Sequence, residues 1–437
     1  MSRQSLAEWH EPETRTDPVE QLVTQGERRI TSLVPIRHGR MSTSAFAYYR
    51  GSAVVMAEDL ASQPDTGLIV QLCGDAHIAN FGLFASPERT LLFDLNDFDE
   101  THPGPFEWDV KRLATSAVLA ARSNGWSASV QRSLARQCAE AYRLAMRGFA
   151  DASTLDVWYS RLDVGGLARL ASSLAPEDVL ARVERNVAGA RRRTNLQAVG
   201  KLTALVDGQR RFVEDPPLLM RIGEDHADLL GLDAMLLYRS TLVSDRAALL
   251  DKFDVVDIAR KVVGVGSVGT RCYVLLLQGV DGSDPLMLQI KEATASVLEP
   301  YAAPSEFAHH GARVVAGQRM LQAATDIFLG WTSATDAHNA VHDSYVRQLR
   351  DMKFSPNLAA LDAPGMELIL RAAGWTLARA HARSGDRIAL AAYLGRSSRF
   401  EEAITRWAVS YADQTEADHS HMVHAIRMAR LPAITGV

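Results

Sequence analysis

The sequence predicts a predominantly helical α+β fold with one small antiparallel β-rich lobe. Apolar residues recur at helical spacing through most of 21–249 and again over 351–437. Residues 250–350 instead contain β-branched and apolar runs joined by turn-forming segments. The polar, acidic stretch 1–20 has neither pattern, and we expect it to be a flexible N-terminal arm.

The composition is that of an ordinary globular protein. The chain has 437 residues, of which 47% are hydrophobic and 23% are charged. This length allows two or three core-forming units. The net charge of −5 gives no general attraction to nucleic acid, and no apolar run approaches the length of a membrane span. We therefore expect neither a nucleic-acid partner nor a membrane partner, and the sequence carries no signal for an oligomeric state.

The cysteines and the start of the chain favour a cytoplasmic location. Cys73, Cys138 and Cys272 are scattered without the spacing of a zinc site or a disulfide framework, which fits a reducing compartment. The first residues lack the basic start and apolar core of a signal peptide.

The stretch "QLCGDAHIANFG" (71–82) places Asp75, His77 and Asn80 close together around a turn between short β segments. The next strand, "TLLFDLNDFD" (90–99), has an acidic end that contains Asp94, Asp97 and Asp99. Magnesium prefers oxygen ligands, and a run of carboxylates with few nearby cations favours a metal. The alternative is an ordinary turn aspartate beside a core histidine.

A glycine-rich segment begins the β-rich region. Gly264, Gly266 and Gly269 spell G-x-G-x-x-G, but an apolar strand-like run follows them instead of the helix that a dinucleotide fingerprint requires. We expect the glycines to bend between two strands, where they would let backbone N–H groups approach phosphate oxygens. A second strand, "LMLQIKEA", contains Lys291, which must face an anion or solvent because an unpaired buried lysine is costly. The alternative is a surface hairpin with a lysine at a strand end.

These segments resemble the site motifs of protein kinases and aminoglycoside phosphotransferases. "CGDAHIAN" is similar to the H-G-D-x-H-x-x-N loop of the latter, with Cys73 in place of the first histidine. The resemblance implies that Asp75 is the catalytic base, supported by His77, and that Asn80 and Asp97 bind magnesium, with Asp94 a further metal candidate.

The same resemblance concerns the glycine segment. It implies nucleotide binding by Gly264, Gly266, Gly269 and Lys291, and a glutamate on the following helix that holds the lysine. Glu306 in "PSEFAHHGARVV" is the nearest carboxylate on the expected helix.

The motifs occur in the reverse of the kinase order, since Asp75 precedes Gly264 by 189 residues. "LILRAAGWTLARAHARSGD" near the C-terminus is similar to the helix that leads into the catalytic loop of phosphotransferases. We therefore expect a circularly permuted, two-lobed, protein-kinase-like fold. Its helical lobe would consist of 21–249, with the catalytic and metal-binding loop, completed by 351–437, and its nucleotide-binding lobe would be 250–350.

Taken whole, residues 21–430 resemble the uncharacterised bacterial domain-of-unknown-function 2252 family. The stretches that carry this resemblance include "RHGRMSTSAFAYYRG", "CGDAHIANFG", "FDLNDFDE", "GPFEWDVKRLA" and "LARAHARSGD". The family implies no established activity. The basic residues of the first stretch, among them Arg37 and Arg40, are either a solvated helix face or a phosphate-contacting group.

The motifs together predict an ATP- and magnesium-dependent phosphotransferase that acts on a small-molecule or protein hydroxyl. Three alternatives stay open at this point. The same site could transfer AMP, the chain could be a nucleotide-binding pseudokinase-type module without turnover, or the acidic cluster could belong to a metal-dependent hydrolase.

Overall fold

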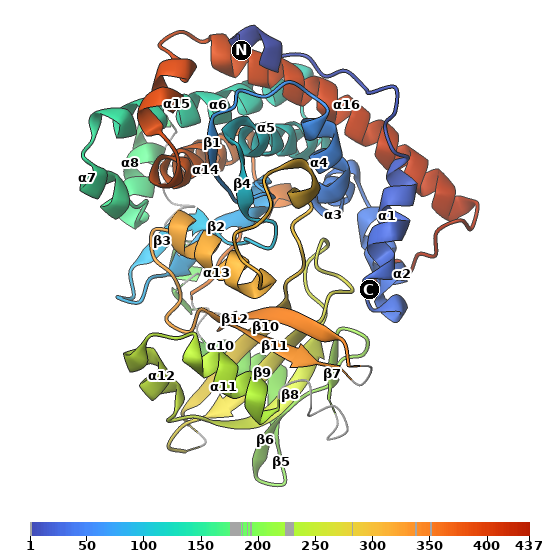
Figure 1. Ribbon diagram of the computed structural model, residues 1–437, viewed down its shortest axis with the longest axis vertical. Coiled ribbons are helices and arrows are strands. Elements are labelled where there is room, and N and C mark those ends of the chain that lie inside the picture. The colour runs from blue at the N-terminus through green and yellow to red at the C-terminus, as the bar shows by residue number, and fades with distance from the viewer. Residues whose placement is uncertain are drawn as a thin grey trace.

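The computed structural model describes residues 2–174, 185, 187–189, 191–192, 195–222, 231–281, 283–336, 339–349 and 352–437. About half of the chain is helical, and the strands form small antiparallel sheets. The helices from the two ends of the chain lie together in one half of the molecule, and the largest sheet forms the other half (Figure 1). The expected mixture of helices with a smaller β-rich part is thus confirmed.

The helical half is built around one central helix, α5, whose residues are buried on nearly every side. α6, α14 and α16 pack around it, so segments from both ends of the sequence share one core. A buried ion pair joins two of them, since Arg143 donates to both carboxylate oxygens of Glu401 at 2.8 Å. The helices of this half are α1 (Pro18–Glu27), α2 (Val34–Met41), α3 (Ala45–Gly51), α4 (Ala53–Ala61), α5 (Phe106–Ser123), α6 (Ala128–Asp151), α7 (Thr154–Tyr159), α8 (Val164–Leu174), α14 (Ala363–Ser384), α15 (Arg387–Leu394) and α16 (Arg399–Arg427).

Two short antiparallel pairs of strands interrupt these helices and carry the acidic segments. β1 (Ile69–Leu72) pairs with β4 (His102–Pro105), and β2 (Phe81–Ala85) pairs with β3 (Leu91–Leu95). The loop with Asp75 connects β1 to β2 through the short 3-10 turn η3 (Ile78–Asn80). The loop with Asp97 connects β3 to β4. Because β1 pairs with β4 and β2 pairs with β3, the two loops link the same two pairs of strands.

The other half contains a six-stranded antiparallel sheet in the order β11-β12-β10-β9-β8-β7. The expected hairpin is confirmed, because β9 pairs with β10 directly after the glycine-rich segment. The strands are β7 (Leu219–Arg221), β8 (Asp254–Lys261), β9 (Cys272–Gln278), β10 (Pro285–Glu292), β11 (Gly330–Thr335) and β12 (Val341–Gln348).

Side chains alternate along β10 and so divide the sheet into two faces. Leu286, Leu288 and Ile290 pack in one cluster with residues of α11 (Leu232–Ser240) and α12 (Ser244–Leu250). Met287 packs in another cluster with α10 (Asn195–Leu202) and the β5 (Thr203–Val206)–β6 (Gln209–Phe212) hairpin. Alternation therefore places Gln289 and Lys291 on the α10 face.

α13 (His310–Leu321) connects the two halves. It follows β10 in the sequence and packs against β11, β12 and α14. The sheet extends beyond 250–350, since β7 adds a strand from a segment that we assigned to the helical part.

The first residues lie against the body of the helical half. Leu6 is fully buried. Arg15 forms ion pairs with Asp59 and Asp418 at 2.7 and 2.6 Å. The expected flexible arm over 1–20 is therefore held to the helical half by Leu6 and Arg15. Two isolated contacts in a polar segment produce no periodic pattern, so the sequence does not signal them. None of the described helices is both long and apolar enough to cross a membrane.

Candidate functional site

The loop after β1 holds Asp75 in a tightly defined backbone. Gly74 has φ +81°, and a Cβ atom there would lie 2.0 Å from the backbone oxygen of Glu100. Both the dihedral angle and the space therefore require glycine. The amides of Cys73 and Gly74 donate to the carboxylate of Asp109 at 2.8 and 3.1 Å, so α5 fixes the start of the loop.

Asp75 is held by three residues. The buried Arg112 donates from Nε to its Oδ1 at 2.5 Å. Asn80 donates from Nδ2 to its backbone oxygen at 2.9 Å. His77 Nε2 lies 3.6 Å from its Oδ2. The arrangement orients one carboxylate and leaves it partly exposed.

His77 is neutral at physiological pH. Burial is the main reason that the pKa of His77 falls to about 4; Asp75 acts in the opposite direction, while Arg50 and Arg112 lower the pKa further. A neutral imidazole beside the carboxylate can orient Asp75, but it does not neutralise its charge.

Lys291 reaches from β10 to the second acidic loop. Its Nζ donates to Asp99 Oδ2 at 2.5 Å and to Asp97 Oδ1 at 3.3 Å, although Asp97 lies 194 residues earlier in the chain. Tyr345, directly opposite Lys291 on β12, donates to Asp99 Oδ1 at 2.7 Å. Burial works against the charge of Lys291, but the two carboxylates raise its pKa. The expected anion partner of this lysine thus comes from the helical half.

Asp97 is a strongly acidic carboxyl group. Burial alone would raise its pKa, but Lys291, Arg347 and Lys353 lower the pKa to about 2. A carboxylate that stays ionised across the physiological range suits a role as a cation ligand.

The glycine-rich loop is clamped by the N-terminal helices. Arg29 Nη1 donates to the backbone oxygens of Gly266 and Val268 at 2.8 and 2.7 Å. Arg40 Nη1 donates to the oxygen of Gly264 at 2.5 Å. Gly264 and Gly269 have positive φ values of 65° and 91°. The basic group before the acidic loop therefore supports the loop backbone instead of forming a fully solvated face, and Arg37 is completely buried.

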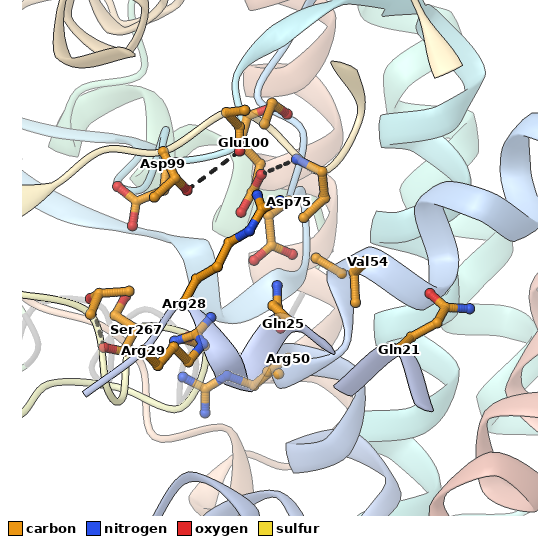
Figure 2. Close-up of a pocket in the computed structure, with 18 of the residues that line it drawn as sticks. Gln21, Gln25, Arg28, Arg29, Arg50, Val54, Asp75, Asp99, Glu100 and Ser267 are labelled. Carbon is orange, nitrogen blue, oxygen red and sulfur yellow. Dashed lines mark hydrogen bonds between the residues drawn. The ribbon is translucent and has the colours of Figure 1, made fainter. Parts of the chain in front are cut away.

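A large cavity of about 840 Å³ opens between the two halves. It brings together six of the residues expected from the sequence: Asp75, His77, Asn80, Asp97, Gly264 and Gly266. Arg28, Arg29 and Arg50 also line it, and the side chain of Arg28 extends toward Asp75 and Glu100 (Figure 2). A second cavity of about 330 Å³ contains Lys291 and shares Asp97 and Gly264 with the first.

Three expected site residues, Asp94, Glu306 and Gly269, line neither cavity. Asp94 is buried within β3, where it accepts from Arg379 of α14 at 2.7 Å and from the amide of Ala323 at 2.9 Å. Asp94 lies inside β3, whereas Asp97 and Asp99 lie in the loop after its end, so a metal role of Asp94 is not supported. Glu306 is exposed on a bend before α13. The predicted pairing of Lys291 with Glu306 is wrong, because Asp97 and Asp99 hold this lysine.

Sequence reasoning missed Arg112, Arg29 and Tyr345. Arg112 lies three residues after Asp109 on α5, and this helical spacing could have placed both beside the loop. The contacts of Arg29 and Tyr345 join segments far apart in the chain, and no local pattern signals them. Gly269 lies in the glycine-rich loop but packs against the Arg29 side chain.

The end of α14 lies beside the strand that leads into the Asp75 loop. The amide of Gln71 in β1 donates to Ser384 Oγ at 3.1 Å. His381 Nε2 lies 3.3 Å from Asp109 Oδ2. The C-terminal helix and the early loop are therefore neighbours, although about 300 residues separate them in the sequence.

Across the part of the chain that the structure describes, no group of three or more His, Cys, Asp or Glu side chains is arranged to hold a metal ion. Asn80 and Asp97 both line the large cavity and offer oxygen atoms. Two such oxygens match the way Mg²⁺ is often bound, through one or two protein ligands with the rest from water and phosphate.

Comparison with known proteins identifies a family but no characterised relative. No curated protein and no solved structure matches the chain. The model of an uncharacterised protein family conserved in bacteria, DUF2252, matches residues 29–425. The chain therefore belongs to the DUF2252 family.

Proposed function

We propose that the protein is an ATP- and magnesium-dependent phosphotransferase that acts on a hydroxyl group of a small molecule or protein. The observation that carries the proposal is the contact of Lys291 with Asp97 and Asp99. A lysine on the second strand after a glycine-rich loop meets a carboxylate loop at one cavity, which is the combination that phosphoryl transfer needs.

The proposed roles follow from the positions of the side chains. Asp75 would accept the proton of the acceptor hydroxyl as the new P–O bond forms at the terminal phosphorus and the bond to the nucleoside diphosphate breaks. Asn80 and Asp97 would hold magnesium, which neutralises phosphate charge when bound. Lys291 and the loop of Gly264 and Gly266 would hold the phosphate chain.

The geometry around Asp75 suits positioning better than strong general-base chemistry. One oxygen of its carboxylate already accepts from Arg112 Nε at 2.5 Å, so Arg112 fixes the orientation of this group. Phosphoryl transfer passes through a loose transition state and relies mainly on alignment and electrostatic stabilisation. An oriented, partly paired aspartate is compatible with that requirement.

A circularly permuted kinase-like architecture is part of the proposal. The contact of Ser384 with Gln71 supports it. In an unpermuted chain of this kind, the helix that corresponds to α14 would lead directly into the strand that corresponds to β1, and the two elements lie next to each other here. The order of β8, the glycine loop, β9, β10 and α13 supports it as well.

A turnover screen tests the function. The full chain is incubated with ATP, magnesium and a panel of hydroxyl-bearing acceptors, and products are weighed by intact-mass spectrometry. Transfer of a phosphoryl group supports the proposal, and transfer of AMP through the same site replaces it, since the two groups differ greatly in mass. Asp75→Asn should abolish turnover while ATP binding persists.

A second candidate function is nucleotide binding without turnover. The Arg112–Asp75 ion pair favours it, since one oxygen of this carboxylate is already engaged by Arg112 and is not available to an acceptor hydroxyl. This candidate predicts that ATP with magnesium raises the thermal unfolding midpoint while no acceptor is modified.

A further inference from the structure

The second cavity carries an excess of positive charge, and we call it the cationic pocket. Five cationic residues line it: Lys201 of α10, Lys261 of β8, Lys291 of β10, Arg347 of β12 and Lys353. Asp97 is the one carboxylate among the described residues of this lining. A lining of about 330 Å³ in which cations outnumber carboxylates attracts anionic ligands.

Two of these cations are built into the protein interior. Lys291 is 3% exposed, and its ammonium group contacts Asp97 and Asp99. Arg347 donates to two neutral oxygens, the backbone oxygen of Asn96 at 3.0 Å and Oε1 of Gln289 at 3.4 Å. The pocket therefore has a buried cation, Lys291, and a partly buried one, Arg347, in addition to Lys201, Lys261 and Lys353.

The shape of the pocket restricts the ligand. α10 covers the neighbouring part of the sheet face, where Ala198 and Val199 pack against Val274 and Met287. The remaining volume suits a compact, extended anion such as a phosphate chain.

The two cavities meet at Asp97, Gly264 and Ser267. Their linings differ in charge, since the large cavity has eight carboxylates and three arginines. An anion in the cationic pocket would have one end at Asp97, which is also in the large cavity with Asp75. This arrangement separates a donor side from an acceptor side.

We propose that the cationic pocket binds a phosphate chain, which Lys201, Lys261 and Lys353 contact in addition to Lys291. That the bound phosphate chain is the phosphoryl donor rests on the proposed function. The chemistry is shared by two sources, a nucleoside triphosphate and inorganic tripolyphosphate. The large cavity is then the site of the acceptor.

Titration calorimetry on the full chain tests the proposal, with ATP and sodium tripolyphosphate as separate probes. Lys201→Gln, Lys261→Gln and Lys353→Gln each remove one charge, and Lys252→Gln removes an exposed lysine outside the pocket as a control. Each pocket variant should weaken the binding of a probe about threefold to tenfold, as for the loss of one charge-assisted contact, whereas the control should not. The unfolding midpoint of each variant without ligand confirms that it is folded.

Each outcome has a distinct meaning. If the three lysine variants weaken both probes equally, the pocket recognises the phosphate chain alone. If ATP alone binds and the variants weaken its binding, the source is a nucleoside triphosphate. The proposal is overturned if none of the three lysine substitutions changes the affinity of a probe, or if neither probe binds. If the lysine variants weaken binding but no acceptor is modified, the cationic pocket stands and the proposed transferase function fails. If an acceptor is modified but the lysine variants bind normally, the transferase function stands and the cationic pocket fails.

Discussion

Replacing Lys291 by Met should destabilise the protein by an amount that depends on pH. Methionine retains the apolar stem but removes the cation that pairs with Asp97 and Asp99. Breaking a fully buried ion pair costs about 3–5 kcal/mol, and breaking an exposed one costs about 0–1 kcal/mol. Lys291 is buried, but the two carboxylate side chains are 31% and 28% exposed, so an intermediate loss is expected.

The pKa of Asp97 gives an independent check on this magnitude. A fall from the ordinary value of 3.8 to about 2 corresponds to at most about 2.4 kcal/mol of stability above pH 4. Lys291 shares this effect with Arg347 and Lys353, and solvent screens part of it. We assign roughly 1 kcal/mol to Lys291 acting on Asp97, and about 2 kcal/mol to its two ion pairs together.

The sign of the pH dependence follows from the direction of that pKa. A carboxyl group with a lowered folded-state pKa contributes stability above its unfolded pKa, and this contribution is lost as the pH falls toward 2. The stability difference between the wild type and Lys291→Met should therefore be largest near pH 6–7 and should shrink below pH 4. Urea denaturation across this range measures it, with Lys252→Met as the exposed-lysine control. A loss that stays constant down to pH 3 would refute the electrostatic explanation and indicate a packing effect.

Three further substitutions test separate parts of the site. Asp75→Asn should reduce turnover at least about a hundredfold and leave the Kd for ATP within about a factor of three, which steady-state kinetics and calorimetry measure together. Gly74→Ala should lower the unfolding free energy by about 3 kcal/mol or more, because the new methyl group clashes with the backbone of Glu100 at a position that also has a positive φ. In the control Gly67→Ala, φ is also positive but the methyl group meets nothing within 4 Å, so the loss should be only about 1 kcal/mol. Equal losses would show that the clash is unimportant. Asp94→Asn should lower the urea midpoint by leaving the buried Arg379 without its anion, and should leave the magnesium dependence of ATP binding unchanged; a changed magnesium dependence would return Asp94 to the metal site.

Much of the local structure could be predicted from the sequence. The glycine-rich loop between strands, the hairpin with Lys291 and the acidic end of β3 follow from patterns within about twenty residues, where alternation and turn chemistry are decisive. The resemblance to phosphotransferases predicts that α14 lies close to the Asp75 loop, and the Gln71–Ser384 contact agrees with this prediction.

The remaining contacts depend on packing between distant segments. Lys291 had several carboxylates within reach in the sequence, and we chose Glu306 because it lay on the expected next helix. The helix begins only at His310, and the folded chain instead brings Asp97 and Asp99 to the lysine. The closeness of Asp94 in sequence predicts that it joins them, yet it lies inside the fully buried strand β3 and pairs with Arg379.

The central claim is that Lys291 and Asp97 belong to one nucleotide site that uses magnesium. Calorimetric titration of ATP into the wild type and into Asp97→Asn, with and without magnesium, tests it most directly. The account predicts that magnesium strengthens ATP binding to the wild type about tenfold or more and that Asp97→Asn removes this gain. Absence of ATP binding to the wild type, or an equal magnesium effect in both proteins, would contradict it.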